Sequence, residues 1–345
     1  MRWSRNRPRP SRDRAPSRVA VTGARGHRWG ALVLAIVLQS LGAGAATADE
    51  SDQARTLTLA ALRDRYADPA GHIAPIDGVD VYYKDEGSGP AILMVHGSVS
   101  TLKTFDSVAA RLIDRYRVIR YDIPPQGLSG PVSDASAARL QPVDIAAKLL
   151  ELLGVRSVTA LGVSSGGTLC IVLAAERPDL VARLILANTP ADPVDASHQR
   201  LDPASEAVQK EAAETHFQSR RFWDVFLDYY AGDPARMTPT IRQQYFDFNR
   251  RAPEPHGLDL VAKVADHAQA VQAMAKVTVP TLLVWGARDP LLTPPAARAL
   301  EAYLVRAQVS TVFLPDVGHY PPLEVPERFA DIVRADLESI APVGK

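Results

Sequence analysis

Short runs rich in apolar residues alternate with amphipathic stretches along most of this chain. Runs of this length without a helical period predict strands, and the longer stretches with apolar residues three and four apart predict helices. The predicted strands cover residues 80–84, 91–95, 117–121, 158–161, 181–187, 279–285 and 309–314, and the predicted helices cover 104–114, 143–154, 166–177, 294–305 and 326–339. Apolar strands with helices between them indicate an α/β fold, with a mostly parallel central sheet covered by helices on both faces.

One interval breaks this alternation. Residues 189–276 separate two predicted strands by 88 residues, whereas connections in such sheets are short. This segment is predicted to be helical, and it holds nine of the 22 aromatic residues of the chain. The sequence therefore predicts an N-terminal arm over 49–75, a first core part over 76–188, this inserted helical unit, and a second core part over 277–345.

The first 48 residues have a composition of their own. Residues 1–30 contain nine Arg and one acidic residue, an apolar run follows over 31–38, and small residues end at Ala46-Thr47-Ala48. This order is typical of a secretory signal peptide, which predicts cleavage after Ala48 and export to the periplasm or the medium, with no membrane attachment afterwards. An uncleaved membrane anchor is the alternative, because about 17 mostly apolar residues reach the lower limit of a spanning helix.

Charge and cysteine content exclude several classes of function. Outside residues 1–30, the chain has 30 basic and 38 acidic side chains, and this balance of −8 disfavours binding to the phosphate backbone of nucleic acid. The single cysteine, Cys170, cannot form an intrachain disulfide or a cysteine-rich metal site. The histidines lack metal-ligand spacing and no glycine-rich phosphate loop is present, so we expect no metal and no cofactor.

A candidate nucleophile stands between a predicted strand and a predicted helix. The segment Gly162-Val163-Ser164-Ser165-Gly166 has the pattern G-x-S-x-G. In this context the glycines permit a sharp strand-to-helix turn, which exposes the serine hydroxyl at the edge of the sheet. Ser164 is therefore the predicted nucleophile, although the same pattern also occurs in ordinary turns.

A serine hydroxyl needs a base, and that base needs an acid. His319 follows the last predicted strand, and Asp289 follows the strand before it. Each of these residues thus stands at the carboxyl end of a strand, where open α/β sheets place their sites. Asp192, which follows an earlier strand, is the alternative acid.

A tetrahedral intermediate also needs hydrogen-bond donors for its oxyanion. We expect the backbone amides of Ser98 and Ser165 to supply them, with Val99 as the alternative to Ser98. His96 precedes this loop, and we expect its role to be structural.

These motifs together resemble the α/β-hydrolase family over about residues 70–340. The motifs are His96-Gly97, the segment 162–167, Gly286 through Pro290, Gly318-His319, and the loop 122–130 with the sequence DIPPQGLSG. The resemblance implies an α/β-hydrolase fold, with Ser164, Asp289 and His319 as a catalytic triad. It also implies that residues 189–276 form a helical cap over the pocket.

Differences from other members of this family reduce the number of reactions that the resemblance implies. A serine at position 164 excludes haloalkane dehalogenases and epoxide hydrolases of this fold, which use an aspartate there. Residues 98–101 lack the Gly-Pro-Gly of relatives that hydrolyse C–C bonds and the Gly-rich run of lipase-like esterases, and Pro124-Pro125 replaces the usual Pro-Gly or Arg-Gly.

The sequence therefore predicts a serine hydrolase that cleaves a small carboxylic ester or lactone through an acyl-enzyme. The alternatives are a C–C bond hydrolase with the same triad and a binding protein without catalytic activity. Aromatic residues of the predicted cap are the candidates for lining an apolar pocket, although packing between cap helices explains them equally well; these are Phe222, Trp223 and Phe226.

Overall fold

The computed structural model describes residues 55–192, 200–264 and 266–339. The predicted signal peptide and the first residues of the predicted arm lie outside these ranges. Within the described ranges, no helix has both the length and the apolar character needed to cross a membrane.

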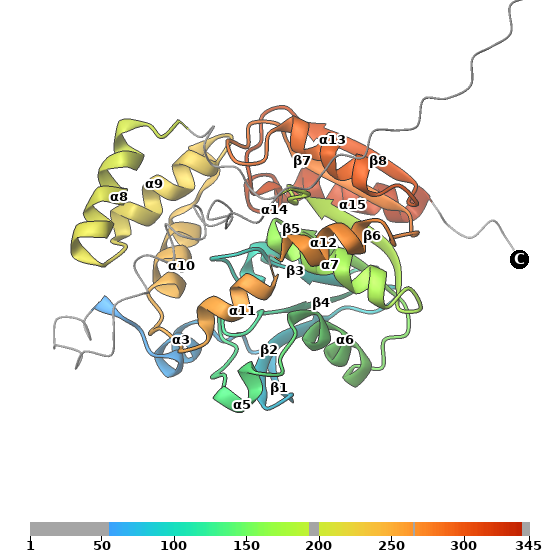
Figure 1. The fold of residues 1–345 in the computed structure, drawn as a ribbon, viewed down its shortest axis with the longest axis horizontal. Coiled ribbons are helices and arrows are strands. Elements are labelled where there is room, and N and C mark those ends of the chain that lie inside the picture. Colours follow the sequence, from blue (N-terminus) through green and yellow to red (C-terminus); the bar gives the residue numbers. More distant parts are fainter. Residues whose placement is uncertain (1–54, 193–199, 265, 340–345) are drawn as a thin grey trace, which may run out of the picture.

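Eight strands form one sheet in the order β1-β2-β4-β3-β5-β6-β7-β8 (Figure 1). Both pairings of β2, with β1 and with β4, are antiparallel, and every other pairing is parallel. The mostly parallel sheet predicted from the apolar runs is confirmed. The strands are β1 (Gly71–Ile76), β2 (Val79–Glu86), β3 (Ala91–Val95), β4 (Arg117–Tyr121), β5 (Val158–Val163), β6 (Val181–Ala187), β7 (Thr281–Gly286) and β8 (Val309–Leu314).

Two features of the first core part differ from the prediction. Residues 71–75 were predicted to belong to the arm, but they form strand β1 together with Ile76. This strand contains Pro75 and buries only Ala74 and Ile76. As an edge strand paired on one side, it tolerates Pro75. The helix expected over 104–114 is reduced to a 3-10 turn, η1 (Leu102–Phe105), and the single turn α4 (Asp106–Ala109).

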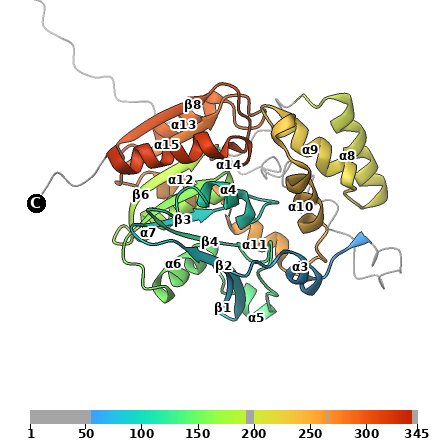
Figure 2. The ribbon, with the colours of Figure 1, turned by 180° about the vertical axis from the view of Figure 1, so that it is seen from behind.

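Helices cover both faces of the sheet. The remaining core helices are α5 (Asp134–Ala137), α6 (Pro142–Leu152), α7 (Ser165–Glu176), α11 (Gly257–Val264), α12 (His267–Met274), α13 (Pro294–Tyr303), α14 (Pro321–Glu324) and α15 (Pro326–Ser339). Alternate residues of β3 belong to different clusters: Leu93 and Val95 share one with residues of α6, α7 and α13, whereas Ile92 and Met94 share the other with residues of α4 and α15. Because successive side chains point to opposite faces and helices cover both faces, such a strand is apolar without polar interruptions (Figures 1 and 2).

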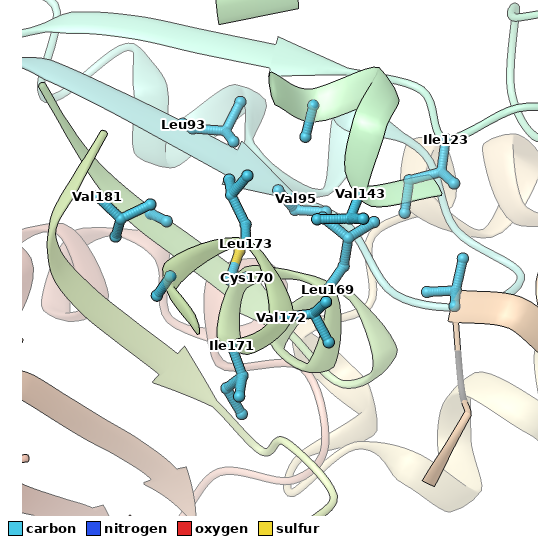
Figure 3. Close-up of a cluster of buried hydrophobic side chains, with 14 of the residues drawn as sticks. Leu93, Val95, Ile123, Val143, Leu169, Cys170, Ile171, Val172, Leu173 and Val181 are labelled. Carbon is cyan, nitrogen blue, oxygen red and sulfur yellow. The ribbon is translucent and has the colours of Figure 1, made fainter. Parts of the chain in front are cut away.

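Helix α7 begins directly after Ser164 and is buried on every side for most of its length. Figure 3 shows residues of this helix in one cluster with Leu93 and Val95 of β3 and Val181 of β6. Cys170 lies in this core, and burial raises the pKa of its thiol. The helix that follows the candidate nucleophile is therefore held rigidly against the sheet.

Three helices of the inserted segment stand beside the sheet rather than on it (Figure 1). They are α8 (Pro203–Thr215), α9 (Arg220–Tyr230) and α10 (Pro239–Asn249), with the 3-10 turn η3 (Pro234–Arg236), and we call them the cap. The last two helices of the interval 189–276, α11 and α12, instead contribute Leu260, Ala270 and Met274 to the core cluster around α7. The inserted segment thus supplies both the cap and part of the helical layer of the core.

The arm contains the helix α3 (Leu59–Tyr66), which lies beside α10 in both views (Figures 1 and 2). Thr58 caps its first turn by accepting a hydrogen bond from the Ala61 amide. Leu57 exchanges backbone hydrogen bonds with residues 250 and 252, just after α10. The arm therefore connects the sheet side of the molecule to the cap.

Candidate active site

Ser164 occupies a strained turn between β5 and α7. Its backbone has φ 54° and ψ −131°, a conformation that residues other than glycine rarely adopt. The two flanking glycines have no room for a side chain: a Cβ on Gly162 would lie 2.5 Å from the backbone of Gly166, and one on Gly166 would lie 2.3 Å from the carbonyl oxygen of His96. The predicted tight turn is therefore present, and it leaves Ser164 half-buried at the edge of the sheet.

The structure brings His319 and Asp289 together. The Nδ1 atom of His319 lies 2.6 Å from Oδ2 of Asp289, whose side chain is completely buried. An ionised carboxylate only accepts hydrogen bonds, so Nδ1 carries the hydrogen and Nε2 is left to receive a proton. Asp192, the alternative acid, instead accepts a hydrogen bond from the Tyr303 hydroxyl at the surface. Within the described part of the chain, no hydrogen bond joins the Ser164 hydroxyl to His319.

Sequence reasoning missed a residue that holds the acid. Asn188 directly follows β6, and its amide nitrogen donates to Oδ2 of Asp289 at 2.7 Å. Its amide oxygen accepts a hydrogen bond from Gly286, 2.9 Å away, so the two strand ends are tied together. The only signal in the sequence was its place at the carboxyl end of a strand, which it shares with many residues that have no role in the site.

The other two donors to Asp289 come from its own loop. Oδ1 accepts hydrogen bonds from the backbone amides of Leu291 at 2.8 Å and Leu292 at 3.0 Å. Together with Asn188 and His319, these amides provide four donors to one buried carboxylate. The charge is thereby fixed in position beside the imidazole.

The two predicted oxyanion donors are neighbours. The hydroxyl oxygens of Ser98 and Ser165 lie 3.0 Å apart. Gly97 lies so close to the nucleophile that a Cβ there would be 2.9 Å from Cβ of Ser164. In the residues that the structure describes, the backbone amides of Ser98 and Ser165 donate no hydrogen bond, so both remain available for a ligand oxygen.

His96 has the structural role expected of it. Its Nε2 atom accepts a hydrogen bond from the amide of Ile123 at 2.9 Å, and its Nδ1 atom lies 2.7 Å from the carbonyl oxygen of Gly97. Burial lowers the pKa of this imidazole to about 4, despite the contact with Gly97. A neutral, fully bonded ring holds the loop and takes no part in proton transfer.

A second missed residue, Glu324, anchors the histidine loop to the cap. Its buried carboxylate accepts one hydrogen bond from Gly318 and one from Gly232, both at 2.8 Å. The amide of His319 itself donates to the carbonyl oxygen of Tyr230 at the end of α9. Burial raises the pKa of the Glu324 carboxyl, whereas the two amides favour its charged form. The position of His319 therefore depends on contacts with the cap.

The aromatic residues proposed for the pocket lie in one hydrophobic cluster, which is formed by the cap helices together with Tyr320. Trp223 is completely buried and Phe222 nearly so, whereas Phe226 is half-buried. The ring centroids of Phe226 and Tyr230 lie 4.7 Å apart, and those of Tyr230 and His319 lie 5.8 Å apart. The cluster also contacts Val99 and Leu291 of loops around the site and Leu323 of α14. The structure thus places these aromatics beside the site, and which of them contact a ligand stays a prediction.

No group of three or more His, Cys, Asp or Glu side chains is arranged to hold a metal ion in the ranges that the structure covers. The arrangement of residues provides a serine hydroxyl on a strained backbone turn, a hydrogen-bonded imidazole–carboxylate pair and two available amides at the carboxyl ends of the strands. These are the groups that nucleophilic acyl transfer requires.

A sequence profile of the alpha/beta hydrolase family matches residues 92–332. The chain is 26% identical over 266 residues to a pimeloyl-(acyl-carrier protein) methyl ester esterase of Nitrosospira multiformis, an alignment that covers 74% of this chain and 98% of that protein. The fold resembles that of the enol-lactonase from Burkholderia xenovorans, with a TM-score of 0.61, 22% identity, and 77% and 100% of the two chains covered. It also resembles the meta-cleavage product hydrolase from Pseudomonas fluorescens, with a TM-score of 0.61, 21% identity, and 79% and 99% covered.

Proposed function

We propose that this chain, which belongs to the alpha/beta hydrolase family, is a serine hydrolase that cleaves a small carboxylic ester or a lactone. The observation that carries the proposal is the 2.6 Å contact between His319 and Asp289 at the sheet edge where Ser164 stands in its strained turn. The proposal is also supported by the esterase relative and by the pair of free amides at Ser98 and Ser165.

In the proposed reaction, the Ser164 oxygen attacks the substrate carbonyl carbon while Nε2 of His319 takes the hydroxyl proton. The amides of Ser98 and Ser165 stabilise the resulting oxyanion. The tetrahedral intermediate collapses as the C–O bond to the alcohol breaks and His319 returns the proton to that oxygen. Water then attacks the acyl-enzyme by the same sequence, which releases the carboxylic acid and restores Ser164.

The Ser164→Ala variant tests this proposal. We expect it to fold and to lose several orders of magnitude of hydrolysis of a p-nitrophenyl ester, because the remaining groups cannot form the acyl-enzyme. In the parent protein, a fluorophosphonate should modify Ser164. Modification of Ser165 instead, or full activity in the variant, would refute the assignment.

The main alternative is hydrolysis of a C–C bond with the same residues. The specific observation in its favour is the similarity in fold to a meta-cleavage product hydrolase. Comparing p-nitrophenyl esters with a vinylogous 1,5-diketone as substrates separates the two reactions. A binding protein without activity would hydrolyse neither.

We also propose that the protein is exported and loses residues 1–48. The support is the order of basic, apolar and small residues in this N-terminal segment. Expression of the full chain in a Gram-negative host, followed by N-terminal sequencing of the periplasmic fraction, should give a form that begins at or near Asp49. A protein that retains Met1 in the membrane fraction would support the uncleaved anchor instead.

A further inference from the structure

The residue after the proposed oxyanion donor has an unusual backbone conformation. Val99 has φ 55°, in the left-handed region. A β-branched residue is rarely found there, because its side chain is crowded against the backbone. Such a conformation persists only where the surroundings hold it in place, and it is concentrated at functional sites.

The cap supplies one of the groups that hold it. The side-chain amide nitrogen of Asn249, the last residue of α10, donates to the carbonyl oxygen of Val99 at 2.9 Å. The same nitrogen donates to the carbonyl oxygen of Tyr245 at 2.8 Å, so both of its hydrogens are used and its direction is set. The Val99 side chain packs against the aromatic cluster of the cap. One residue of the loop is therefore held through both its carbonyl group and its side chain.

The other end of the same loop is held by the core. Gly97 lies against Ser164, and the hydroxyl of Ser98 lies 3.0 Å from that of Ser165. Between these contacts and Asn249 stands the peptide group that joins Ser98 to Val99. The φ angle of Val99 sets the orientation of that peptide group. A return of Val99 to a negative φ would therefore rotate the peptide group and displace the backbone amides of Ser98 and Val99.

We propose that Asn249 is a positioning residue, which completes the oxyanion hole by holding Val99 in its left-handed conformation. This inference rests on the proposed function. It implies that the oxyanion hole is formed correctly only when the cap is docked, because the core contacts described above hold Gly97 and Ser98, whereas Asn249 of the cap holds Val99. In the described part of the chain, the Asn249 side chain donates to Val99 and Tyr245 and makes no hydrogen bond to Ser164 or His319, so its effect is on the geometry of the donors.

The test uses two substitutions that remove the contact in different ways. In Asn249→Asp the side chain keeps its shape but cannot donate, and in Asn249→Ser the hydroxyl can still bond within the helix but is too short to reach Val99. Thr240→Ala, at an exposed position of the same helix, is the matched control. For p-nitrophenyl butyrate, we expect kcat to fall about tenfold in both Asn249 variants, less than the loss from removing a donor outright, with KM changed less than twofold.

Two further measurements separate positioning from a general loss of structure. An alkyl boronic acid, which binds as a tetrahedral anion, should bind the Asn249 variants about tenfold more weakly, in line with kcat. Hydrogen exchange of residues 96–101 should become faster in these variants and not in Thr240→Ala, and the midpoint of thermal unfolding should change little.

The possible failures can be told apart. Absence of hydrolysis that depends on Ser164 in the parent protein would refute the proposed function, whereas hydrogen exchange would still show whether Asn249 holds the loop. Parent-like kcat and boronate affinity in both Asn249 variants, or unchanged exchange of residues 96–101, would overturn the role of Asn249. Loss of activity in proportion to loss of folded protein in both variants would make Asn249 merely structural and would also overturn it.

Discussion

Asp247 of α10 connects the N-terminal arm to the cap, and its substitution has a calculable cost. Its side chain is completely buried. Oδ2 accepts hydrogen bonds from Arg65 at 2.8 Å, Tyr66 at 2.6 Å and Gln243 at 3.0 Å, and Oδ1 accepts two from Arg250. Two of these donors belong to the arm, so the carboxylate joins segments about 180 residues apart in the chain.

The size of the effect follows from the pKa of this carboxyl group. Burial raises the pKa of Asp247, but the hydrogen bonds from Tyr66, Gln243, Arg250 and Arg65 outweigh it and lower the pKa from 3.8 to about 2. A lowered pKa means that the folded state prefers the charged form, so the stabilisation is complete well above pH 3.8 and is lost as the pH falls through about 2. The difference corresponds to about 2 kcal/mol of stability at neutral pH, of which about 1 kcal/mol is lost by pH 3.

Urea unfolding at pH 7 and pH 3 measures both quantities. We expect Asp247→Asn to be less stable than the parent by about 2 kcal/mol at pH 7, and the difference to shrink by about 1 kcal/mol at pH 3. Asp259→Asn, which removes an exposed acid on α11, should match the parent at both pH values. An equal deficit for Asp247→Asn at the two pH values would refute the assignment of this stabilisation to the charge.

Two further predictions concern the site and the cap. Asn188→Ala should lower stability by about 2–4 kcal/mol, because the buried Gly286 amide and the Asp289 carboxylate each lose a hydrogen-bond partner. It should also lower kcat more than it changes KM. Urea unfolding measures the stability and ester kinetics measure kcat and KM; an unchanged kcat would contradict the role of Asn188. The Trp223 side chain is completely buried, so Trp223→Ala should lower stability by about 3–5 kcal/mol without changing the preference for acyl chain length. The Phe226 side chain is half-buried, so Phe226→Ala should lower stability less and should shift that preference. Thermal melts and a graded ester series test this pair, and the same preference in both variants would leave the pocket to be lined by other residues.

Elements with a strong local signal were predictable from the sequence. Strands that are buried on both faces read as short apolar runs, and the sheet contains them where they were expected. The edge strand β1 was missed because only Ala74 and Ile76 face the core, which leaves too little alternation to distinguish a strand from an arm. The two helices α11 and α12 resemble cap helices in sequence, since an amphipathic period does not specify which surface the apolar face covers.

The sequence by itself provided the candidate nucleophile and base and two candidate acids, Asp289 and Asp192, because each follows a strand and parallel strands bring their carboxyl ends to one edge. The structure pairs Asp289, and not Asp192, with His319. Only the tertiary structure decided which polar side chains hold that site in place. Asn188, Glu324 and Asn249 have no motif of their own, and Asn249 lies 150 residues from the Val99 carbonyl group that it contacts. Local patterns record the period of a helix or strand, whereas a hydrogen bond between distant segments depends on how the whole chain packs.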